Sequence, residues 1–563
     1  PYRSLMIGWR AMILLIWLLS IVHGGLFILS TPQWEGIDEA FHYGYVQHLA
    51  ESGTLPVFGR TAVSKELVTS FRFAPVSTVV NANLGNLYTS FPDYWSLPEA
   101  ERKARENALR KIPSSYRAIP DDSANPLMNY EAQHPPLYYF LCAGIYRLFS
   151  DSDQPTLTLL LRWFSLLIGS LTIPIAYGVA KEGRFPWSPH FVPLLIALLP
   201  MFISTVSRIS NDCLGVTLFS CLILLVCRYI NSGFSRKYAV WIGVIAGLGL
   251  LTKAYFLAAI PPIAAVVLFA GFKRRSFALS ARHMLFVGFV CLALSGLWYA
   301  RNYIHYGTIS GLFVLASERA VLPGEYLGKL FEIPWQAGLE IIFRQQIWTG
   351  NSSFIGLSRA IYRSAYLLFF LAFLGIGRIY WCRIRKKELG VCRDTEPPDA
   401  MVLFYLCFVL GMLYQMFSTY VATGRIVTGG WYLNAVVIPG VTILVLGLSA
   451  LRPRSGGRIR ALLVAYVLLI NFLAYFCKAI PYYSGFIIAR FHLSHFFELY
   501  SPANIGNILD RLSLNKPEFI TPGVIGVWIL LYVMMVAAVL IAPGARRRLS
   551  AERTNLLRRI PGV

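Results

Sequence analysis

Long apolar runs recur along the 563-residue chain, and short polar or basic segments separate them. A helix of about 20 apolar residues crosses the roughly 30 Å hydrocarbon core of a bilayer. The pattern therefore predicts an all-α polytopic membrane protein with a bundle of about 12–13 transmembrane helices. The runs of this kind lie near residues 12–30, 157–179, 191–206, 214–230, 238–251, 255–272, 284–300, 365–381, 400–417, 431–451, 461–480 and 523–542.

Positive charge concentrates in the short loops between alternate runs, which is typical of cytoplasmic loops. A net charge of +23 would favour nucleic-acid binding in a soluble domain, but this distribution indicates a lipid bilayer and no nucleic acid. If the basic loops are cytoplasmic, both chain ends are cytoplasmic and the remaining loops face outward. The basic groups are Lys181 and Arg184; Arg228, Arg236 and Lys237; Lys273, Arg274 and Arg275; Arg383, Arg385, Lys386 and Lys387; Arg452, Arg454, Arg458 and Arg460; and Arg546, Arg547 and Arg548.

This topology divides the chain into a first span, a long outer loop and two groups of later helices. The loop of about 125 residues far exceeds an ordinary connection, and such loops usually carry function. The predicted segments are 1–30, the first transmembrane helix; 31–156, the extracytoplasmic loop; 157–300, the core helices; 301–364, a second outer loop; 365–543, the C-terminal helices with outer loops 418–430 and 481–522; and 544–563, a cytoplasmic tail.

One apolar stretch, residues 134–150, is too short to cross the membrane as a helix. We expect it to be a half-inserted or interfacial helix, although a full crossing, which would invert every later loop, stays open. Two further helices are expected in the first loop. Residues 38–53 have an apolar flank suited to the membrane surface, and residues 96–111 begin with a Ser96 to Glu99 capping-box pattern and are charged almost all round.

Acidic and histidine side chains cluster where the chain leaves the first apolar run, in "EGIDEAFHYGYV". On a helix Asp38 and His42 share a face, while Glu39 points about 100° away. This arrangement suits a carboxylate base that His42 or Glu39 orients or tunes. The alternative is that the acids only offset the dipole at a helix N-terminus.

A second constellation joins two spans on the same outer side, in "SRISNDCLG", where Arg208 and Asp212 are four residues apart. A salt-bridged turn would look the same, but Asp212 begins a span at a depth where an unpaired charge is costly. Outward cations at span ends complete the set. Each could reach lipid headgroups instead, but together they suit a phosphate group; they are Lys253, Arg301, Arg344 and Arg425.

Other patterns carry little functional weight. "DSD" at 151–153 lacks the βαβ surroundings of a nucleotide-sugar transferase, and no Walker loop or dinucleotide fingerprint occurs. The nine cysteines show no metal-like or paired spacing and are interpreted as core residues.

Six short motifs, in this order, resemble the GT-C superfamily of membrane glycosyltransferases, in particular the protein O-mannosyltransferase and aminoarabinose-transferase type. They are "IDEAFHY", "YEAQHPPLYYFL", "SRISND", "GLGLLTKAYF", "WYARNYIHYG" and "GGWYLNAVVIPG". One departure is the late "GRY" of relatives, which reads "GGWY" here, so that Arg425 is the remaining candidate for the missing arginine.

The resemblance implies a GT-C type bundle and inverting transfer of a sugar from a polyprenyl-phosphate carrier to a glycan, lipid or protein acceptor. Asp38 then matches the catalytic aspartate, with Glu39 and His42 beside it, and Asp212 the second acid. No cofactor is certain; a divalent cation (Mg or Mn) stays open. The donor phosphate is expected at Lys253, Arg301, Arg208, Arg344 and Arg425, and the substrate cavity at His134, Tyr138, Trp348, Trp431 and Tyr432.

The expected location is a bacterial inner membrane, with the site facing the periplasm. Two other classes remain as alternatives. A transporter or flippase of lipid-linked sugars would place ionisable residues deep within its spans, and a glycan polymerase or ligase would carry its large loop late in the chain.

Overall fold

The computed structural model describes residues 2–309, 323–386, 396–486 and 493–557. Helices make up this part of the chain, and no β-strand occurs in it. Ten helical segments within the described residues are long and apolar enough to cross a membrane, which confirms the all-α polytopic class. They include α1 (Tyr2–Ser30), α8 (Gln154–Ser170) with α9 (Thr172–Glu182), α12 (Asp212–Asn231), η3 (Ala254–Ala259) with α14 (Ile260–Lys273), α15 (Phe277–Tyr306), α18 (Arg359–Ile384), α19 (Pro397–Thr423), η5 (Gly430–Val436) with α20 (Val437–Leu451), η6 (Pro453–Ser455) with α21 (Gly456–Asn471), η7 (Phe472–Ala479) and α22 (Ile480–Tyr483), and α25 (Pro522–Leu557).

Two of the twelve expected spans are not among these ten helices. The run 191–206 is divided into α10 (Phe191–Leu198) and α11 (Pro200–Val206), because Pro200 cannot continue the preceding helix. The run 238–251 forms α13 (Arg236–Leu250), which has 15 residues and is about 22 Å long. Both segments nevertheless pack inside the bundle, since α13 contacts α12 and α15, and α10 contacts α1 and α20.

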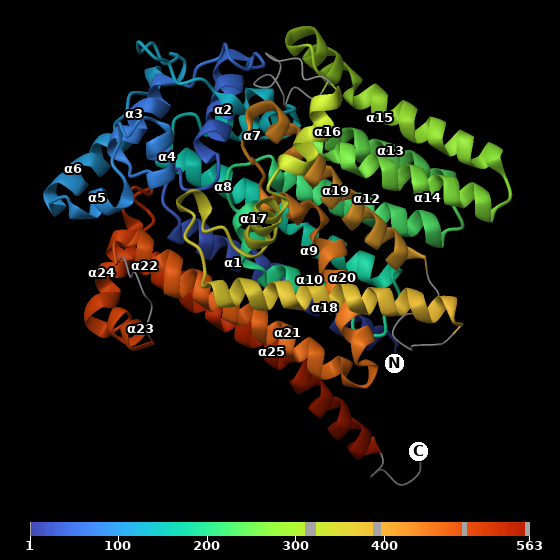
Figure 1. Ribbon diagram of the computed structural model, residues 1–563. Helices are drawn as coiled ribbons and strands as arrows, with labels where there is room; N and C mark the ends of the chain where they lie inside the picture. The colour runs from blue at the N-terminus through green and yellow to red at the C-terminus, as the bar shows by residue number, and fades with distance from the viewer. Residues whose placement is uncertain (1, 310–322, 387–395, 487–492, 558–563) are drawn as a thin grey trace.

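Close helix packing in the C-terminal half depends on glycine. A Cβ placed on Gly375 of α18 would lie 1.8 Å from the carbonyl oxygen of Gly447 in α20, so these two backbones touch. Small residues at such crossings let membrane helices approach closely. Figure 1 shows α18 running along the same side of the bundle as α21 and α25, with α13, α14 and α15 grouped on another side.

The first outer loop folds into short helices at one end of the bundle, with α3 to α6 farthest out (Figure 1). The helix expected at the membrane surface is instead buried inside the protein, since α2 packs against α7 and residues 39–47 are all buried. The elements of this loop are α2 (Glu39–Ser52), α3 (Lys65–Phe73), α4 (Thr78–Asn83), α5 (Phe91–Ser96), α6 (Glu99–Arg110), η1 (Ser114–Arg117), η2 (Tyr130–Gln133) and α7 (Leu137–Leu148).

Three predictions concern details of this loop, and their outcomes differ. The stretch 134–150 contains the 12-residue α7, about 18 Å long, and is not among the ten candidate spans of the described residues. The solvated helix is confirmed, because Leu109 is the buried residue of α6. The capping box is wrong: α6 begins after Pro98, which provides no side-chain cap, and the Ser96 hydroxyl donates to the carbonyl oxygen of Asp93.

The later outer segments carry short helices. Parts of the predicted segments 301–364, 481–522 and 544–563 lie outside the described residues, and the predicted segment boundaries stay predictions. The remaining elements are α16 (Pro323–Glu332), α17 (Trp335–Ile347), η4 (Asn351–Ser353), α23 (Leu493–Leu499) and α24 (Pro502–Ser513).

Candidate functional site

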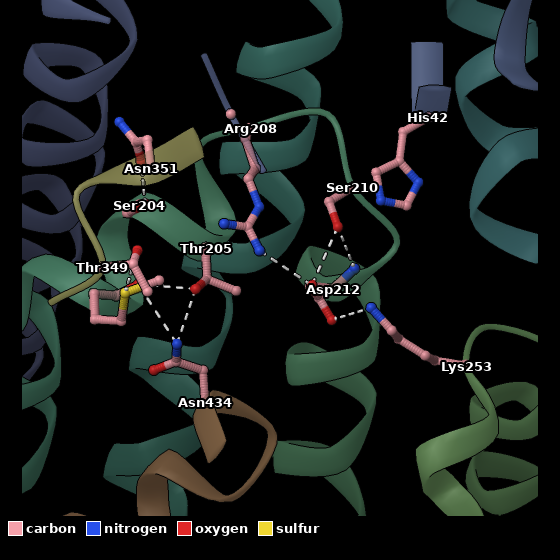
Figure 2. A network of polar contacts seen from close by, with 12 residues as sticks. His42, Ser204, Thr205, Arg208, Ser210, Asp212, Lys253, Thr349, Asn351 and Asn434 are labelled. Carbon is pink, nitrogen blue, oxygen red and sulfur yellow. Dashed lines mark hydrogen bonds and ion pairs between the residues drawn. The ribbon is translucent and has the colours of Figure 1, made fainter. Parts of the chain in front are cut away.

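Asp212, the first residue of α12, is held between two cations that come from different segments. Lys253 Nζ donates to Asp212 Oδ1 at 2.6 Å, and Arg208 Nη2 donates to Oδ2 at 3.3 Å. Figure 2 shows the two side chains reaching the carboxylate from opposite sides. Ser210 Oγ adds a third donor at 3.2 Å, and all four residues are buried. We call Arg208, Asp212 and Lys253 the cation cluster.

Arg208 has more donors than this cluster uses. Its side chain is 1% exposed, yet its Nε and Nη1 groups find no hydrogen-bond partner among the described residues. Unused donors on a buried guanidinium are costly unless a water or a ligand accepts from them. An anion adjacent to Arg208 would meet this need.

Two aromatic rings from η5 lie against these cations. The Arg208 guanidinium carbon is 5.9 Å from the centroid of Trp431, and Lys253 Nζ is 4.7 Å from that of Tyr432. Such rings favour the charged form of a cation without occupying its hydrogen-bond donors. The structure thus brings together Arg208, Lys253, Trp431 and Tyr432, as the sequence motifs predicted.

Asp38 occupies the N-cap position of α2 but does not act as a cap. Its backbone is left-handed (φ 58°, ψ 11°), and its side chain accepts no hydrogen bond from the helix. Instead the Tyr130 hydroxyl donates to Asp38 Oδ1 at 2.6 Å. The Asp38 side chain is partly exposed, and Oδ2 accepts no bond from the described residues. These contacts disfavour the alternative in which Asp38 serves only the helix end.

The electrostatic surroundings of Asp38 link it to the cation cluster. Its removal from bulk water and the nearby Glu131 carboxylate raise the pKa of Asp38 to about 6, although the Tyr130 hydrogen bond and the charges of Arg208 and Lys253 act in the opposite direction. Asp38 therefore lies within electrostatic reach of both cations that hold Asp212. An aspartate with this pKa is a stronger base than usual and is still ionised at pH 7.

His42 shares its helix with Asp38 but contacts other groups. Its Nδ1 shares a hydrogen bond of 2.7 Å with the Tyr139 hydroxyl and lies 3.4 Å from Glu131 Oε2. His134 Nε2 approaches the same Glu131 oxygen at 2.9 Å. Burial lowers the pKa of His42 to about 4, so this imidazole is neutral at pH 7. Asp38 and His42 thus both meet the segment 130–134, through Tyr130 and Glu131.

Glu39 does not join this group. Arg162 Nε and Nη2 donate to its two oxygens at 2.7 and 2.5 Å, and the backbone N–H groups of Gly36 and Ile209 also donate to them. The remaining Arg162 donors reach the carbonyl oxygens of Thr31 and Pro32. With its carboxylate surrounded in this way, Glu39 fastens the loop after α1 to α8, and the predicted catalytic role finds no support in its contacts.

Gly36, just before α2, allows the chain to pass close to both Arg208 and Glu39. A Cβ at this position would lie 2.9 Å from Arg208 Cβ and 2.9 Å from Glu39 Cδ. The chain before α2 thus passes directly over Arg208. Glycine is required here by the close approach of side chains on two sides.

Three predicted phosphate-binding arginines lie apart from the cation cluster. Arg301 Nη2 donates to the carbonyl oxygen of Pro56, on the flank of the first loop. Arg425 is exposed after α19, and its side chain makes no hydrogen bond or ion pair with the described residues. Arg344 lines a separate pocket together with Trp348. Tyr138 is buried behind the site, where its hydroxyl contacts Ser165 and accepts from the Ser210 N–H.

The described residues provide no group of three His, Cys, Asp or Glu side chains placed to hold a metal ion. Two of the acids near the site already face cations or imidazoles: Asp212 faces Lys253 and Arg208, and Glu131 faces His42 and His134. No step is therefore assigned to a divalent cation.

Sequence reasoning missed Tyr130, Glu131 and the partner of Glu39. A signal was present for the first two, because the motif "YEAQHPPLYYFL" begins with them, although the cavity residues predicted from it are His134 and Tyr138. Arg162 lies 123 positions from Glu39, and only the packing of α8 against the loop after α1 brings them together.

A family model described as dolichyl-phosphate-mannose-protein mannosyltransferase matches residues 133–299. The matched segment contains Arg208, Asp212 and Lys253, whereas Asp38 precedes it. The resemblance to GT-C glycosyltransferases seen in the motifs is confirmed over this segment. No curated protein sequence matches the chain at a significant level.

Solved structures of membrane glycosyltransferases are similar to this chain at low identity. ArnT from Cupriavidus metallidurans bound to undecaprenyl phosphate has 15% identity and a TM-score of 0.43, over 98% of this chain and 80% of that one. The Archaeoglobus fulgidus oligosaccharyltransferase in complex with Zn and sulfate has 13% identity and a TM-score of 0.38, over 89% and 57%. The archaeal oligosaccharyltransferase AglB from the same organism, in complex with an inhibitory peptide and a dolichol-phosphate, has 13% identity and a TM-score of 0.38. The match covers 83% of this chain and 54% of that one. This chain therefore spans little more than half the length of the archaeal enzymes.

Proposed function

We propose that this protein is an inverting glycosyltransferase that moves a sugar from a polyprenyl-phosphate carrier to an acceptor hydroxyl. The observation that carries the proposal is the buried Arg208, which has two unused donors, shares Asp212 with Lys253, and lies against Gly36, two residues before the partly exposed Asp38. A proton acceptor next to unsatisfied cationic donors suits a reaction that deprotonates one oxygen and releases an anion at another. The family match over residues 133–299 supports the same reaction class.

Asp38 acts as the general base. The acceptor oxygen attacks the anomeric carbon from the side opposite the phosphate, and Asp38 Oδ2 takes the proton as the new C–O bond forms. The bond between the anomeric carbon and the phosphate oxygen breaks, and its electron pair leaves with the carrier phosphate. The Tyr130 hydroxyl on Oδ1 orients the carboxylate and leaves Oδ2 for the incoming proton.

The cation cluster stabilises the leaving phosphate. Arg208 Nε and Nη1 donate to the phosphate oxygens, and Lys253 adds a positive charge that Asp212 holds in place. Donors aimed at developing negative charge in a buried site are worth about 3–4 kcal/mol each. Asp212 is thus assigned a positioning role, and Asp38 the proton transfer.

The proposed location is a bacterial inner membrane, with the site on the periplasmic face. The support is the side on which basic loops accumulate, since 207–213 and the loop 31–156 fall opposite the basic segments of the chain. A glycan, lipid or protein can supply the acceptor hydroxyl. Thiol labelling of a cysteine introduced next to residue 38 in sealed vesicles tests the placement, and cytoplasmic labelling contradicts it.

Purified protein incubated with polyprenyl-phosphate sugars tests the function. We expect sugar transfer or donor hydrolysis, and Asp38→Asn should lower the rate at least about 10²-fold while the protein still folds. Asparagine tolerates the left-handed backbone at this position. The matched control is Asp151→Asn, an exposed acid in the same loop, which should be silent.

Equal loss in both variants would mean that the acids are structural. If the sugar-lipid instead crosses the membrane of reconstituted vesicles without any change in its chemistry, the protein is a flippase and the proposal is wrong.

A further inference from the structure

A cavity of about 900 Å³ lies between α17 and the first turns of α18, apart from the cation cluster. Three arginines line it: Arg344 from the last turn of α17, and Arg359 and Arg363 from the start of α18. Glu340 is the one acidic residue among the lining residues. The apolar part of the wall includes Phe343, Trp348, Phe354 and Leu357.

The three arginines of this pocket are exposed, and their positive charge is not paired in the part of the chain that the structure describes. None of the three guanidinium groups has a hydrogen-bond or ion-pair partner in the described ranges. The Tyr366 hydroxyl, which also lines the pocket, is buried and lacks a partner there as well. Arginines at the expected outer end of a span oppose the usual charge bias, so an anion offers the simplest reason for this cluster.

The face of α18 that carries two of these arginines continues as an apolar stripe. Arg359 and Arg363 are four residues apart, and Leu367, Phe370 and Leu374 follow on the same face of the helix. These three apolar side chains are exposed by 56%, 59% and 50%. A cationic end followed by an open apolar stripe matches a ligand with an anionic head and a hydrocarbon chain.

The pocket borders the proposed active site through η5. Gln345, which lines it, accepts a hydrogen bond from the Gly430 N–H at 2.8 Å, and the next residue, Trp431, lies against Arg208. The loop after Trp348 also contacts the chain before α2, because the Ser352 hydroxyl donates to the carbonyl oxygen of Gly36, two residues before Asp38. The pocket is thus linked, through Gln345 and the loop after Trp348, to the segments that carry Trp431 and Asp38.

We propose that the pocket lined by Arg344, Arg359 and Arg363 binds the phosphate-bearing headgroup of an anionic lipid, whose chains follow the apolar stripe of α18. This site is separate from the cation cluster, to which the carrier phosphate was assigned. The inference goes beyond the proposed function, because it concerns binding and does not require that transfer occur.

Binding of dioctanoyl phosphatidic acid to the full chain in phosphatidylcholine nanodiscs tests the proposal by titration calorimetry. We expect saturable binding that Arg359→Gln with Arg363→Gln weakens at least about tenfold. The matched control is Arg385→Gln with Lys386→Gln, which removes two exposed charges from the opposite end of α18 and should leave binding unchanged. Equal weakening in both double variants, or none in the first, overturns the site.

Two further binding measurements distinguish a lipid headgroup from a soluble anion, and the pocket from the cation cluster. Inorganic phosphate should bind much more weakly than phosphatidic acid; equal affinity would mean a soluble-anion site and overturn the lipid assignment. Arg208→Lys and Asp38→Asn should bind phosphatidic acid like the wild type, even if both lose transfer. If Arg208→Lys weakens binding as much as the pocket variant does, the lipid occupies the cation cluster and the proposal is wrong.

Discussion

Two buried acid–arginine pairs, Glu39 with Arg162 and Asp212 with Arg208, differ in how fully the guanidinium is hydrogen-bonded. In the Glu39–Arg162 pair every nitrogen of the guanidinium has a protein acceptor. In the Asp212–Arg208 pair, the described residues engage only Nη2 of the guanidinium. Both arginines are buried and both face a carboxylate, so burial and ion pairing alone do not distinguish a structural pair from a functional one. The unused hydrogen-bonding capacity does, because a saturated pair can only hold the fold, whereas an unsaturated one can bind a ligand.

Glu39→Gln should produce the largest change in stability. It leaves Arg162 buried without its counter-charge, and breaking a buried pair on one side costs about 3–5 kcal/mol. A thermal-unfolding scan with a thiol-reactive dye should show a clear fall in Tm, whereas Asp38→Asn should leave Tm nearly unchanged. An unchanged Tm together with lost transfer would return Glu39 to the catalytic role that the motif suggested.

Arg208→Lys should lower the rate of sugar transfer more than it lowers stability. The charge and the pairing with Asp212 can be kept, but a lysine lacks the planar set of additional donors. We expect kcat to fall about 10²-fold with a small change in Tm. Arg425→Lys is the comparison, because this exposed side chain lies away from the cluster and should change kcat little. A larger effect at Arg425 would indicate that it replaces the arginine missing from the late motif.

The pH dependence of transfer should report the pKa of Asp38. The carboxylate accepts a proton only when ionised, so the rate should be constant above about pH 7 and fall about tenfold per unit well below pH 6. An unperturbed aspartate would place this limb near pH 4. Measurement of kcat/KM from pH 4.5 to 8 distinguishes the two, and a flat profile down to pH 5 would contradict the proposed environment of Asp38.

Tyr130→Phe should give the smallest effect. It removes the hydroxyl that donates to Asp38 and keeps the ring, which packs 4.2 Å from that of Phe41. Because this hydrogen bond lowers the pKa of Asp38, its loss should move the acid limb of the profile to higher pH, by up to about one unit. The measured quantity is the pH at the midpoint of the acid limb of the pH–rate profile. A fall in kcat with no shift of the midpoint would mean that Tyr130 acts by other means.

Most of the cation cluster could be predicted from the sequence motifs. Arg208 and Asp212 lie on one turn, and Lys253 follows a short apolar run, so their proximity at one side of the bundle follows from helix length. Asp38 was selected because it opens an acidic and histidine cluster directly after the first apolar run, and its role as a base stays a prediction. Glu39 carries the same signal, since adjacent acids look alike in a sequence, and its catalytic role stays a prediction that its contacts with Arg162 do not support.

The repeated apolar runs of about 20 residues determined that this chain forms a helical membrane bundle, because a helix of that length satisfies its backbone hydrogen bonds within itself across a bilayer. The uneven distribution of charge indicated which loops share a side. Tertiary structure alone decided which acid is neutralised and which remains available, since Arg162 meets Glu39 across 123 positions and Tyr130 meets Asp38 across 92. Hydrogen-bond saturation is a property of three-dimensional contacts, and no local pattern of residues encodes it.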